Sequence, residues 1–290
     1  VDQDKNVFFL VDNDGKFAAF MLNEEADKLI SLKSDINALF NSPVLGYNSK
    51  DDIVYQFWAN RDSHEVYYFD PKTDYAPTTA ISSISWDDPN FPNIEGFGVW
   101  AAKCNFTMGP DGKMYSRMLG GNLVRIDVEN ARGENLTNGD LVGTKDGSAY
   151  GLVFDPQDEN VFYFSNNDKH CIYKYDLRTK ECACWAGQEG KSGYLDGPIG
   201  QAMFNKPGQM CVDSEGNIIL TDTENHCIRK ITMSTGYVST LAGKPQNSGY
   251  VNGSAEDAQF KKPLGICIDN DDVMYIGDSE NRAIRRLAVE

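Results

Sequence analysis

Three histidines are the side chains whose type could bind a transition metal. His64, His170 and His226 each fall in a polar turn between two short apolar runs. Three imidazoles brought to one face of a protein could hold a zinc ion. Asn122 and Arg282 occupy the same turn position elsewhere, so histidine is tolerated there rather than required. We therefore predict no metal site, and we keep zinc held by the three histidines as the alternative.

A long segment bounded by tryptophans could bind a ligand. Trp86 and Trp100, two of the four tryptophans, flank a run rich in proline, glycine and asparagine. Long loops on a rigid scaffold often carry binding sites, and tryptophan beside aspartate or asparagine suits a sugar. The alternative is that these aromatic side chains fold inward, because large aromatic residues are mostly buried.

Two arginines stand in runs that otherwise carry apolar or acidic residues. Arg61 and Arg117 could meet an acidic ligand near the axis of the fold. The alternative for each is an ion pair, since the chain has 43 acidic residues. We include both among the candidate ligand-binding residues.

Two acidic turns carry the oxygen ligands that calcium prefers. Residues 12–15 read Asp-Asn-Asp-Gly, and residues 269–272 read Asp-Asn-Asp-Asp. Neither continues into an EF-hand loop, which needs a glutamate at its twelfth position. We expect no cofactor, beyond calcium bound weakly at such turns.

Sequence signatures of the common enzyme classes are absent. The chain has no GxSxG, HExxH or GxxxxGK[ST] motif, and no GxGxxG that opens a helix. Its seven cysteines form no CxxC pair, so zinc ribbons and thioredoxin-like sites are not indicated. These absences favour a binding protein over an enzyme.

The charge of the chain limits its partners. The formal net charge is −16, which repels phosphate backbones, so we expect neither nucleic acid nor an anionic membrane as a partner. No apolar run reaches the roughly 18 residues that a membrane span needs. The chain starts with Val1 and shows no signal sequence, so we expect a mature product whose targeting segment has been removed.

The chain repeats itself at an offset of 56 residues. The matching pairs are Phe204 and Phe260, Pro207 and Pro263, Cys211 and Cys267, Asp222 and Asp278, Asn225 and Asn281, and Arg229 and Arg285. The same offset run backwards takes residues 226–228 to residues 170–172. A period near 50 residues is typical of a repeat architecture. A residue that recurs in this way is first a structural part of the repeat.

The best-formed repeat predicts four short strands. They cover residues 209–213, 218–222, 227–231 and 237–242, and each is bounded by glycine, asparagine, aspartate or serine. Four antiparallel strands per repeat describe a propeller blade. The turn of the first hairpin occurs six times along the chain, which predicts six blades of about 48 residues.

The sequence thus predicts an all-β fold, one six-bladed β-propeller domain over residues 1–290. The blades cover approximately residues 1–42, 43–95, 96–145, 146–203, 204–259 and 260–290. Residues 24–40 are expected to form irregular outer strands of the first blade, with a short helix as the alternative. The last blade stops after its third strand, and residues 1–6 are one candidate for its fourth.

The repeat resembles the NHL-repeat family of six-bladed β-propellers. The turn at His226 reads Asp-Thr-Glu-Asn-His-Cys-Ile-Arg over residues 222–229, and the linkers share Gly-Tyr-x-x-Gly over residues 193–197 and 249–253. The match is specific over residues 146–290 and looser over residues 1–145. The resemblance implies that these turns and the linkers between blades lie on one face. It is closest to a bacterial branch that is often exported or surface-anchored, frequently with an Ig-like domain upstream.

The function predicted from these features is a binding module of an exported bacterial protein, located at the cell surface or in the periplasm. A carbohydrate or a protein is the expected ligand. The candidate ligand-binding residues are Trp86, Trp100, Arg61, Arg117, His64, His170, His226, Asn225 and Asn281. The alternative is a metal-dependent hydrolase or lyase with its site at the mouth of the channel, since one lyase that resembles these propellers holds zinc with histidines.

Overall fold

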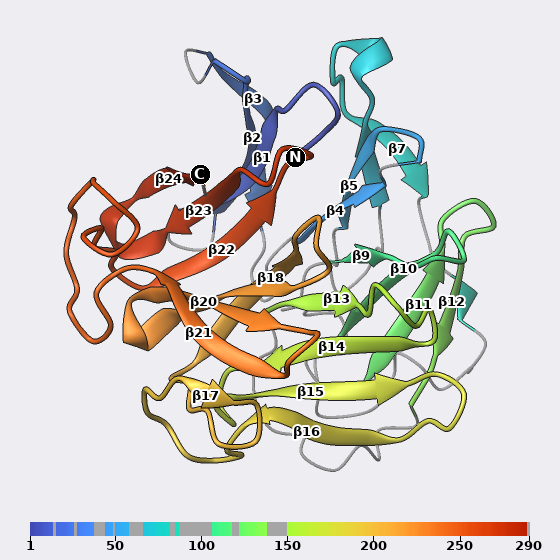
Figure 1. The fold of residues 1–290 in the computed structure, drawn as a ribbon. Helices are drawn as coiled ribbons and strands as arrows, with labels where there is room; N and C mark the ends of the chain where they lie inside the picture. Colours follow the sequence, from blue (N-terminus) through green and yellow to red (C-terminus); the bar gives the residue numbers. More distant parts are fainter. Residues whose placement is uncertain are drawn as a thin grey trace. The chain divides into compact units, whose positions relative to one another are not determined.

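The computed structural model describes most of the 290 residues. It leaves out residues 14–15, 26–27, 38–43, 49, 58–65, 82–84, 87–105, 118–121, 138–149 and 289–290. The chain divides into two compact units, Val1–Leu141 and Val142–Glu290. Apart from three short 3₁₀ helices, the regular structure in the described residues is β-strand (Figure 1). None of these helices is long and apolar enough to cross a membrane.

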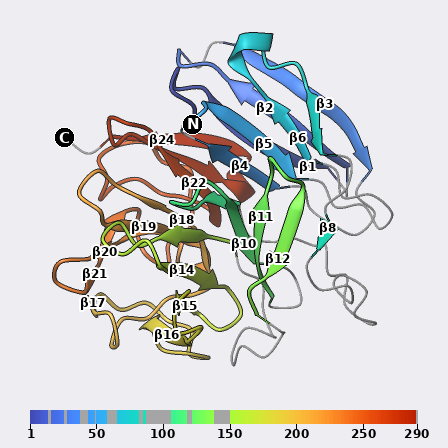
Figure 2. The same cartoon turned by 90° about the vertical axis from the view of Figure 1, so that its right-hand side faces the viewer.

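The first unit contains three sheets (Figure 2). Blade 1 consists of β1 (Val7–Asn13), β2 (Lys16–Leu22) and β3 (Leu29–Asn37). Blade 2 consists of β4 (Val44–Asn48), β5 (Ile53–Phe57), β6 (Val66–Phe69) and β7 (Thr78–Ile81), with the 3₁₀ helix η1 (Pro71–Thr73) before β7. Blade 3 consists of β8 (Ser85–Trp86), β9 (Thr107–Met108), β10 (Met114–Arg117), β11 (Leu123–Asp127) and β12 (Arg132–Asn135).

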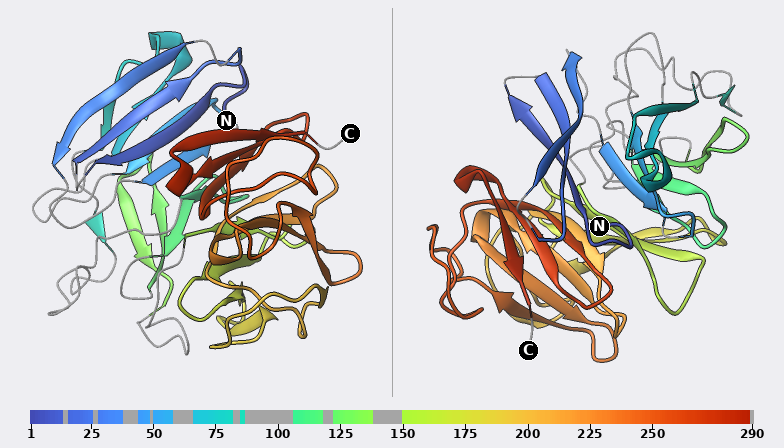
Figure 3. Two further views of the ribbon diagram at one scale, coloured as in Figure 1. Left: turned by 90° about the vertical axis from the view of Figure 1, so that its left-hand side faces the viewer. Right: turned by 90° about the horizontal axis from the view of Figure 1, so that it is seen from above.

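The second unit contains the other three sheets, drawn from yellow-green to red in Figure 3. Blade 4 consists of β13 (Leu152–Phe154), β14 (Val161–Asn166), β15 (Cys171–Asp176) and β16 (Cys182–Gly187). Blade 5 consists of β17 (Gly197–Pro198), β18 (Pro207–Val212), β19 (Ile218–Asp222), η2 (Thr223–Asn225), β20 (Cys227–Thr232) and β21 (Tyr237–Ala242). Blade 6 consists of β22 (Pro263–Ile268), β23 (Met274–Asp278), η3 (Ser279–Asn281) and β24 (Ala283–Leu287).

The strand order confirms the predicted fold class, an all-β six-bladed propeller built from four-stranded antiparallel blades. In the described residues, blades 1 and 6 show three strands. Blades 3 and 5 each gain a fifth, two-residue strand from a neighbouring segment, β8 beside β12 and β17 beside β21.

The predicted strands of the best-formed repeat agree with the structure. β19 covers Ile218–Asp222, and β21 covers Tyr237–Ala242. The turn between β18 and β19 forms because Asp213 Oδ1 accepts hydrogen bonds from the backbone N–H of Asn217 (2.7 Å) and Glu215 (3.1 Å). Gly216 completes this turn with a φ of +80°, where a side chain would be strained.

The core of the second unit lies between neighbouring sheets. Apolar side chains of blade 4 pack against those of blade 5, and both faces of β14 and β19 are buried. The largest members of this cluster are Tyr163, Ile172, Phe204, Met210, Ile218, Leu220 and Ile231. Because each sheet is covered on both faces, its middle strands read as nearly continuous apolar runs.

Two predictions for the first unit are decided by the structure. Residues 29–37 form the strand β3, so the helix alternative for this stretch is wrong. Residues 1–6 form no strand, which argues against them as the fourth strand of blade 6. Instead, Asp2 accepts hydrogen bonds from Asn6 N (2.7 Å) and from the hydroxyl of Tyr75 (2.6 Å).

Candidate functional site: the turn-and-linker face of blades 4 to 6

The turns between the second and third strands of blades 4 to 6 share one backbone conformation. His170, His226 and Arg282 have φ values of 56°, 59° and 53°, in the left-handed region. In blades 5 and 6 this residue ends a 3₁₀ turn, η2 or η3. Residues other than glycine rarely adopt this conformation, but histidine adopts it more readily than most and β-branched residues avoid it. Histidine therefore suits the position, and arginine also occupies it in blade 6.

The two described histidines connect their turns to the following linkers. His170 Nδ1 accepts a hydrogen bond from Lys206 N at 3.1 Å, and His226 Nδ1 accepts one from Lys262 N at 3.2 Å. Burial, and then the neighbouring Lys206, lowers the pKa of His170, which keeps the imidazole neutral as the bond requires. His64 lies outside the described residues. Within the part that is described, no group of three or more His, Cys, Asp or Glu side chains could hold a metal ion.

In blades 5 and 6, a buried arginine of the third strand holds the preceding linker. Arg229 is fully buried, and its guanidinium donates to Asp222 Oδ2 (2.7 Å) and Asp196 Oδ1 (2.7 Å). It also donates to the backbone carbonyls of Met203 (3.1 Å) and Leu195 (3.0 Å). Burial raises the pKa of Asp222 to about 6, although Arg229 acts against that rise. The arginine therefore fixes both arms of the linker to the blade.

Blade 6 repeats this arrangement around Arg285. Its guanidinium donates to Asp278 Oδ2 (2.9 Å), to the carbonyl of Gln259 (3.0 Å) and to the carbonyl of Val251 (2.7 Å). The repeated pairs predicted from the 56-residue offset thus occupy the same places in the structure. The arginine and aspartate pairs share the role of holding the linker that precedes the blade.

Two aromatic rings lie about 5 Å from each guanidinium. Arg229 lies 4.9 Å from the ring centroid of Tyr194 and 5.1 Å from that of Phe204. Arg285 lies 5.0 Å from the centroids of both Tyr250 and Phe260. Stacking of this kind attracts the cation to the ring and limits ring movement. The linker tyrosines are therefore held in place by the blade beneath them.

The asparagines predicted as ligand contacts bind the linkers. Asn225 Nδ2 donates to the carbonyl of Gly193 at 2.8 Å and to Asp222 Oδ2 at 2.8 Å. Asn281 Nδ2 donates to the carbonyl of Gly249 at 2.7 Å and to Asp278 Oδ2 at 2.8 Å. Both amide groups therefore hold the backbone of a linker against the turn of its own blade.

The linkers expose apolar side chains, which the sequence analysis did not single out. Leu195 is 47% exposed, Tyr250 62% and Val251 43%, among the most exposed large hydrophobic residues of the described chain. Each linker is a short paired loop, with bridges between Leu195 and Met203 and between Val251 and Gln259. The recurrence of Tyr194 and Tyr250 at the repeat offset was the available signal. It could not show that only one of the two rings is left open.

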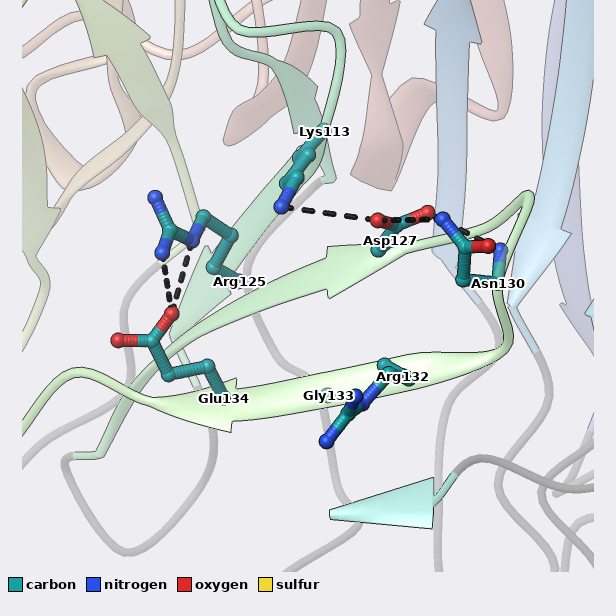
Figure 4. Close-up of a pocket in the computed structure, with 7 residues that line it drawn as sticks. All are labelled: Lys113, Arg125, Asp127, Asn130, Arg132, Gly133 and Glu134. Atoms are coloured by element: carbon teal, nitrogen blue, oxygen red, sulfur yellow. Dashed lines mark hydrogen bonds and ion pairs between the residues drawn. The ribbon is translucent and has the colours of Figure 1, made fainter. Parts of the chain in front are cut away.

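Blade 3 carries a hollow of about 570 Å³, and its lining residues are drawn in Figure 4. It is lined by Lys113, Arg125, Asp127, Asn130, Arg132, Gly133 and Glu134. Arg125 Nε donates to Glu134 at 3.0 Å, and Lys113 lies 3.6 Å from Asp127. The hydrogen bond from Asn130 is the main cause of the lowered pKa of Asp127. Because these cations already meet carboxylates, we place the candidate site on the linkers and not in this hollow.

The remaining predicted residues are spread over the first unit. Arg117 ends β10 and is only 2% exposed. The backbone of Trp86 belongs to β8, but its side chain lies outside the described part, as do Trp100 and Arg61.

The candidate calcium turn at residues 269–272 lies in the second unit. There, Asp269 Oδ1 accepts hydrogen bonds from Asp271 N and Val273 N, both at 2.9 Å.

Sequence comparison identifies one repeat and several relatives. An NHL repeat matches residues 204–231, the span from the end of a linker through β20. The chain is 25% identical over 87% of its length to Suppressor of Quenching 1, a chloroplastic protein of Arabidopsis thaliana. It is 30% identical over 52% of its length to NHL repeat-containing protein 2 of Gallus gallus. The chain spans 25% and 19% of the length of these two relatives.

Solved structures share the fold along the whole chain. A structural genomics protein of unknown function from Bacteroides thetaiotaomicron has a TM-score of 0.77 at 20% identity, covering 100% of this chain and 73% of that one. A protein described as an auxiliary nutrient binding protein from the same organism has a TM-score of 0.71 at 21% identity, covering 97% and 68%. With the strand order and the matched repeat, these results make the chain a six-bladed β-propeller that carries an NHL repeat in blade 5.

Proposed function

We propose that the chain is a binding module that recognises a protein ligand with the turn-and-linker face of blades 4 to 6. The observation that carries this proposal is the exposure of Leu195, Tyr250 and Val251 on linkers that are held rigidly. Exposed apolar side chains gathered on one surface are typical of protein interaction sites.

The rigidity of the linkers supports binding. Arg229 and Arg285 hold the linkers through backbone carbonyls, ion pairs and ring stacking. A surface that is already ordered loses little conformational entropy when a ligand binds, so more of the contact energy appears as affinity. Tyrosine is well suited to such a surface because a large contact area comes with few rotatable bonds.

Two proteins of the same fold support a binding role and a place outside the cytoplasm. The propellers from Bacteroides thetaiotaomicron and Bacteroides ovatus are described as auxiliary nutrient binding proteins. By analogy of fold we propose that this chain also serves binding, in an exported protein. The carbohydrate that we predicted from Trp86 and Trp100 is the competing ligand class.

A ligand screen tests the proposal. The purified chain is applied to a peptide array and to a glycan array, alongside the variants Tyr250→Ala and Tyr237→Ala. Tyr237 is the control, because it is 47% exposed and is the first residue of β21, in blade 5. We expect peptide or protein ligands whose affinity falls at least tenfold in Tyr250→Ala and is unchanged in Tyr237→Ala. Binding of glycans alone, lost in Trp86→Ala or Trp100→Ala, would overturn the proposal in favour of a carbohydrate ligand.

A further inference from the structure

We propose that Cys184 and Cys171 of blade 4 form a modification site, a pair of thiols that is oxidised reversibly to a disulfide by exchange with an external disulfide compound. Cys184 is the thiol that reacts first, and Cys171 closes the bond. Both residues lie in strands of blade 4, and neither belongs to the linkers of the proposed ligand site.

The two cysteines lie on neighbouring strands and on the same face of the sheet. Cys171 begins β15 and lies opposite Gly187 of β16. Cys184 of β16 lies opposite Tyr173 of β15. Residues two apart along a strand point to one face, and directly opposite residues share that face. Cys171 and Tyr173 are two apart, so Cys184 is the diagonal neighbour of Cys171 on their shared face.

The thiol of Cys184 is directed along β16 toward Cys171. The pairing register shifts at this point, and Trp185 is the extra residue of the resulting bulge. Cys184 Sγ donates to the carbonyl of Gly187 at 3.8 Å, and Gly187 is the residue opposite Cys171. Cys182 lies on the same face but two residues in the other direction, opposite Tyr175. The geometry therefore pairs Cys184 with Cys171 and not with Cys182.

The two thiols differ in acidity because they interact. A hydrogen bond from the thiol of Cys171 to Cys184 is the main cause of the lowered pKa of Cys184 and of the raised pKa of Cys171. The backbone N–H of Glu189 also lowers the pKa of Cys184, whereas burial and the Glu189 carboxylate act against it. Burial raises the pKa of Cys171 further. When the pair ionises, the remaining proton therefore stays on Cys171 and the thiolate is Cys184.

Exposure separates the two thiols in the same way. Cys171 has no exposed surface, whereas Cys184 is partly exposed. The thiolate is the nucleophile in thiol chemistry, so a reactive cysteine must be both ionised and accessible. Cys184 meets both conditions, and Cys171 meets neither. An accessible cysteine of lowered pKa beside a second thiol that can complete a disulfide is typical of redox-active pairs.

Blade 5 shows that the repeat does not need both thiols. At the 56-residue offset, Cys171 corresponds to Cys227, but Cys184 corresponds to Thr240. Cys227 is fully buried, and burial raises its pKa well above the ordinary value. The first cysteine is therefore a buried part of the repeat, whereas the second is particular to blade 4. Cys227 is an internal control, because the matching position of its blade carries a hydroxyl group instead of a thiol.

The reaction consists of two thiol–disulfide exchanges. The Cys184 thiolate attacks one sulfur of a disulfide R–S–S–R, which forms a mixed disulfide and releases R–S⁻. Cys171 then gives its proton to R–S⁻ and attacks Cys184 Sγ, which forms the bond between the two cysteines and releases the second R–S⁻. Two electrons pass from the pair to the external disulfide, which becomes two thiols. No further oxidant is needed, and an excess of thiol reverses both steps.

The test exposes the reduced chain to oxidised glutathione at a pH near the ordinary thiol pKa of about 8.5. Free thiols are then trapped with N-ethylmaleimide and located by peptide mapping with mass spectrometry. We expect a disulfide between Cys171 and Cys184 in most of the chain, with Cys227 still reduced. Cys171→Ser should stop the reaction at a glutathione adduct on Cys184, and Cys184→Ser should leave Cys171 reduced. Cys182→Ser is the matched control, because Cys182 is a partly exposed cysteine of the same strand and should not be needed.

Thermal unfolding measures the effect of the bond on the fold. The disulfide closes the loop of residues 172–183 between the third and fourth strands of blade 4, which should raise the unfolding temperature by about 5 °C. Dithiothreitol should remove this rise. Cys182→Ser should keep the rise, and Cys184→Ser should lose it.

Three results on the parent chain would overturn the inference. They are free thiols on both Cys171 and Cys184 although dithiothreitol in a parallel sample is oxidised, a disulfide that joins either residue to another cysteine, and a glutathione adduct that persists on Cys184. All three are read without a substitution, so a variant that fails to fold does not leave the question open.

Discussion

Arg229 and Asp222 form an ion pair with 2.7 Å between Nη1 and Oδ2, and neither side chain is exposed to solvent. The pair joins the end of β19 to β20, and Asp196 extends it to the linker. Blade 6 repeats the pair with Arg285 and Asp278 at 2.9 Å. The turn-and-linker face therefore depends on ion pairs between charges that are taken out of water.

Removing one member of this pair should destabilise the chain strongly. Arg229→Ala leaves the Asp222 carboxylate buried without its counter-ion, and a loss of about 3–5 kcal/mol of unfolding free energy is expected. Urea unfolding followed by circular dichroism measures this loss. Arg178→Ala is the matched control, because Arg178 also bonds two aspartates but is 53% exposed. If both variants unfolded at the same urea concentration as the parent, the ion pair would not hold the linker.

The linker tyrosines should respond differently to loss of the hydroxyl group. Tyr194→Phe removes the bond to Thr240 Oγ1, and about 1 kcal/mol of stability should be lost. Tyr250→Phe should leave stability unchanged, because the ring is 62% exposed and no such bond was found for its hydroxyl in the described chain. Thermal unfolding of the two variants and the parent makes the comparison. An equal loss in both would mean that Tyr250 is covered as Tyr194 is.

His170 should make stability depend on pH. Its pKa is lowered in the folded chain, so the unfolded chain, with an ordinary value near 6.5, binds the proton more readily. Stability from this residue is therefore present at neutral pH and is lost as the pH falls below about 6.5. Asp222 acts in the opposite direction, because burial raises its pKa to about 6 and the folded chain holds its proton more tightly.

The variant His170→Asn separates these two contributions, since asparagine tolerates the left-handed conformation. Unfolding midpoints are measured at about pH 7.5 and about pH 5. The parent should lose more stability on acidification than the variant. An identical change in both proteins would show that His170 does not titrate in this range.

Two glycines at the ends of the fourth strands of blades 4 and 5 should not tolerate a side chain. Gly243 has a φ of +96°, and a Cβ there would lie 3.0 Å from both the carbonyl oxygen of His226 and the ring of Phe260. Gly243→Ala should therefore lower the unfolding free energy by about 1–3 kcal/mol. The same argument applies to Gly187. Gly200→Ala is the control, because a Cβ at Gly200 would meet nothing within 4 Å; similar losses in both variants would contradict the steric explanation.

Chelation should not destabilise the chain. His170 and His226 direct Nδ1 to separate backbone amides, and neither bond requires a metal. We expect the same unfolding temperature with and without EDTA. Elemental analysis of the protein before and after chelation measures its metal content. A stoichiometric transition metal whose removal lowers the unfolding temperature would instead favour the zinc alternative.

The residue pattern alone predicts the blades, because strand and turn signals are local. The apolar run at residues 218–222 and the Asp-Ser-Glu-Gly turn before it predict β19 and its hairpin to within a residue. The Asn-His turn likewise predicts where the second strand ends and the third begins. These features depend on neighbours in the sequence, so one repeat is enough to recognise them.

The role of each side chain was decided by the tertiary structure. Arg229 and Asp196 are 33 residues apart, and only packing of the linker onto β20 brings them together. Asn225 and Asn281 were predicted to meet a ligand, but their amide groups hold the linkers. Tyr194 and Tyr250 occupy equivalent places in the repeat, yet β21 covers the first and leaves the second open. Burial depends on what lies across from a residue in space, and a repeat in sequence cannot show which copy has a neighbour there.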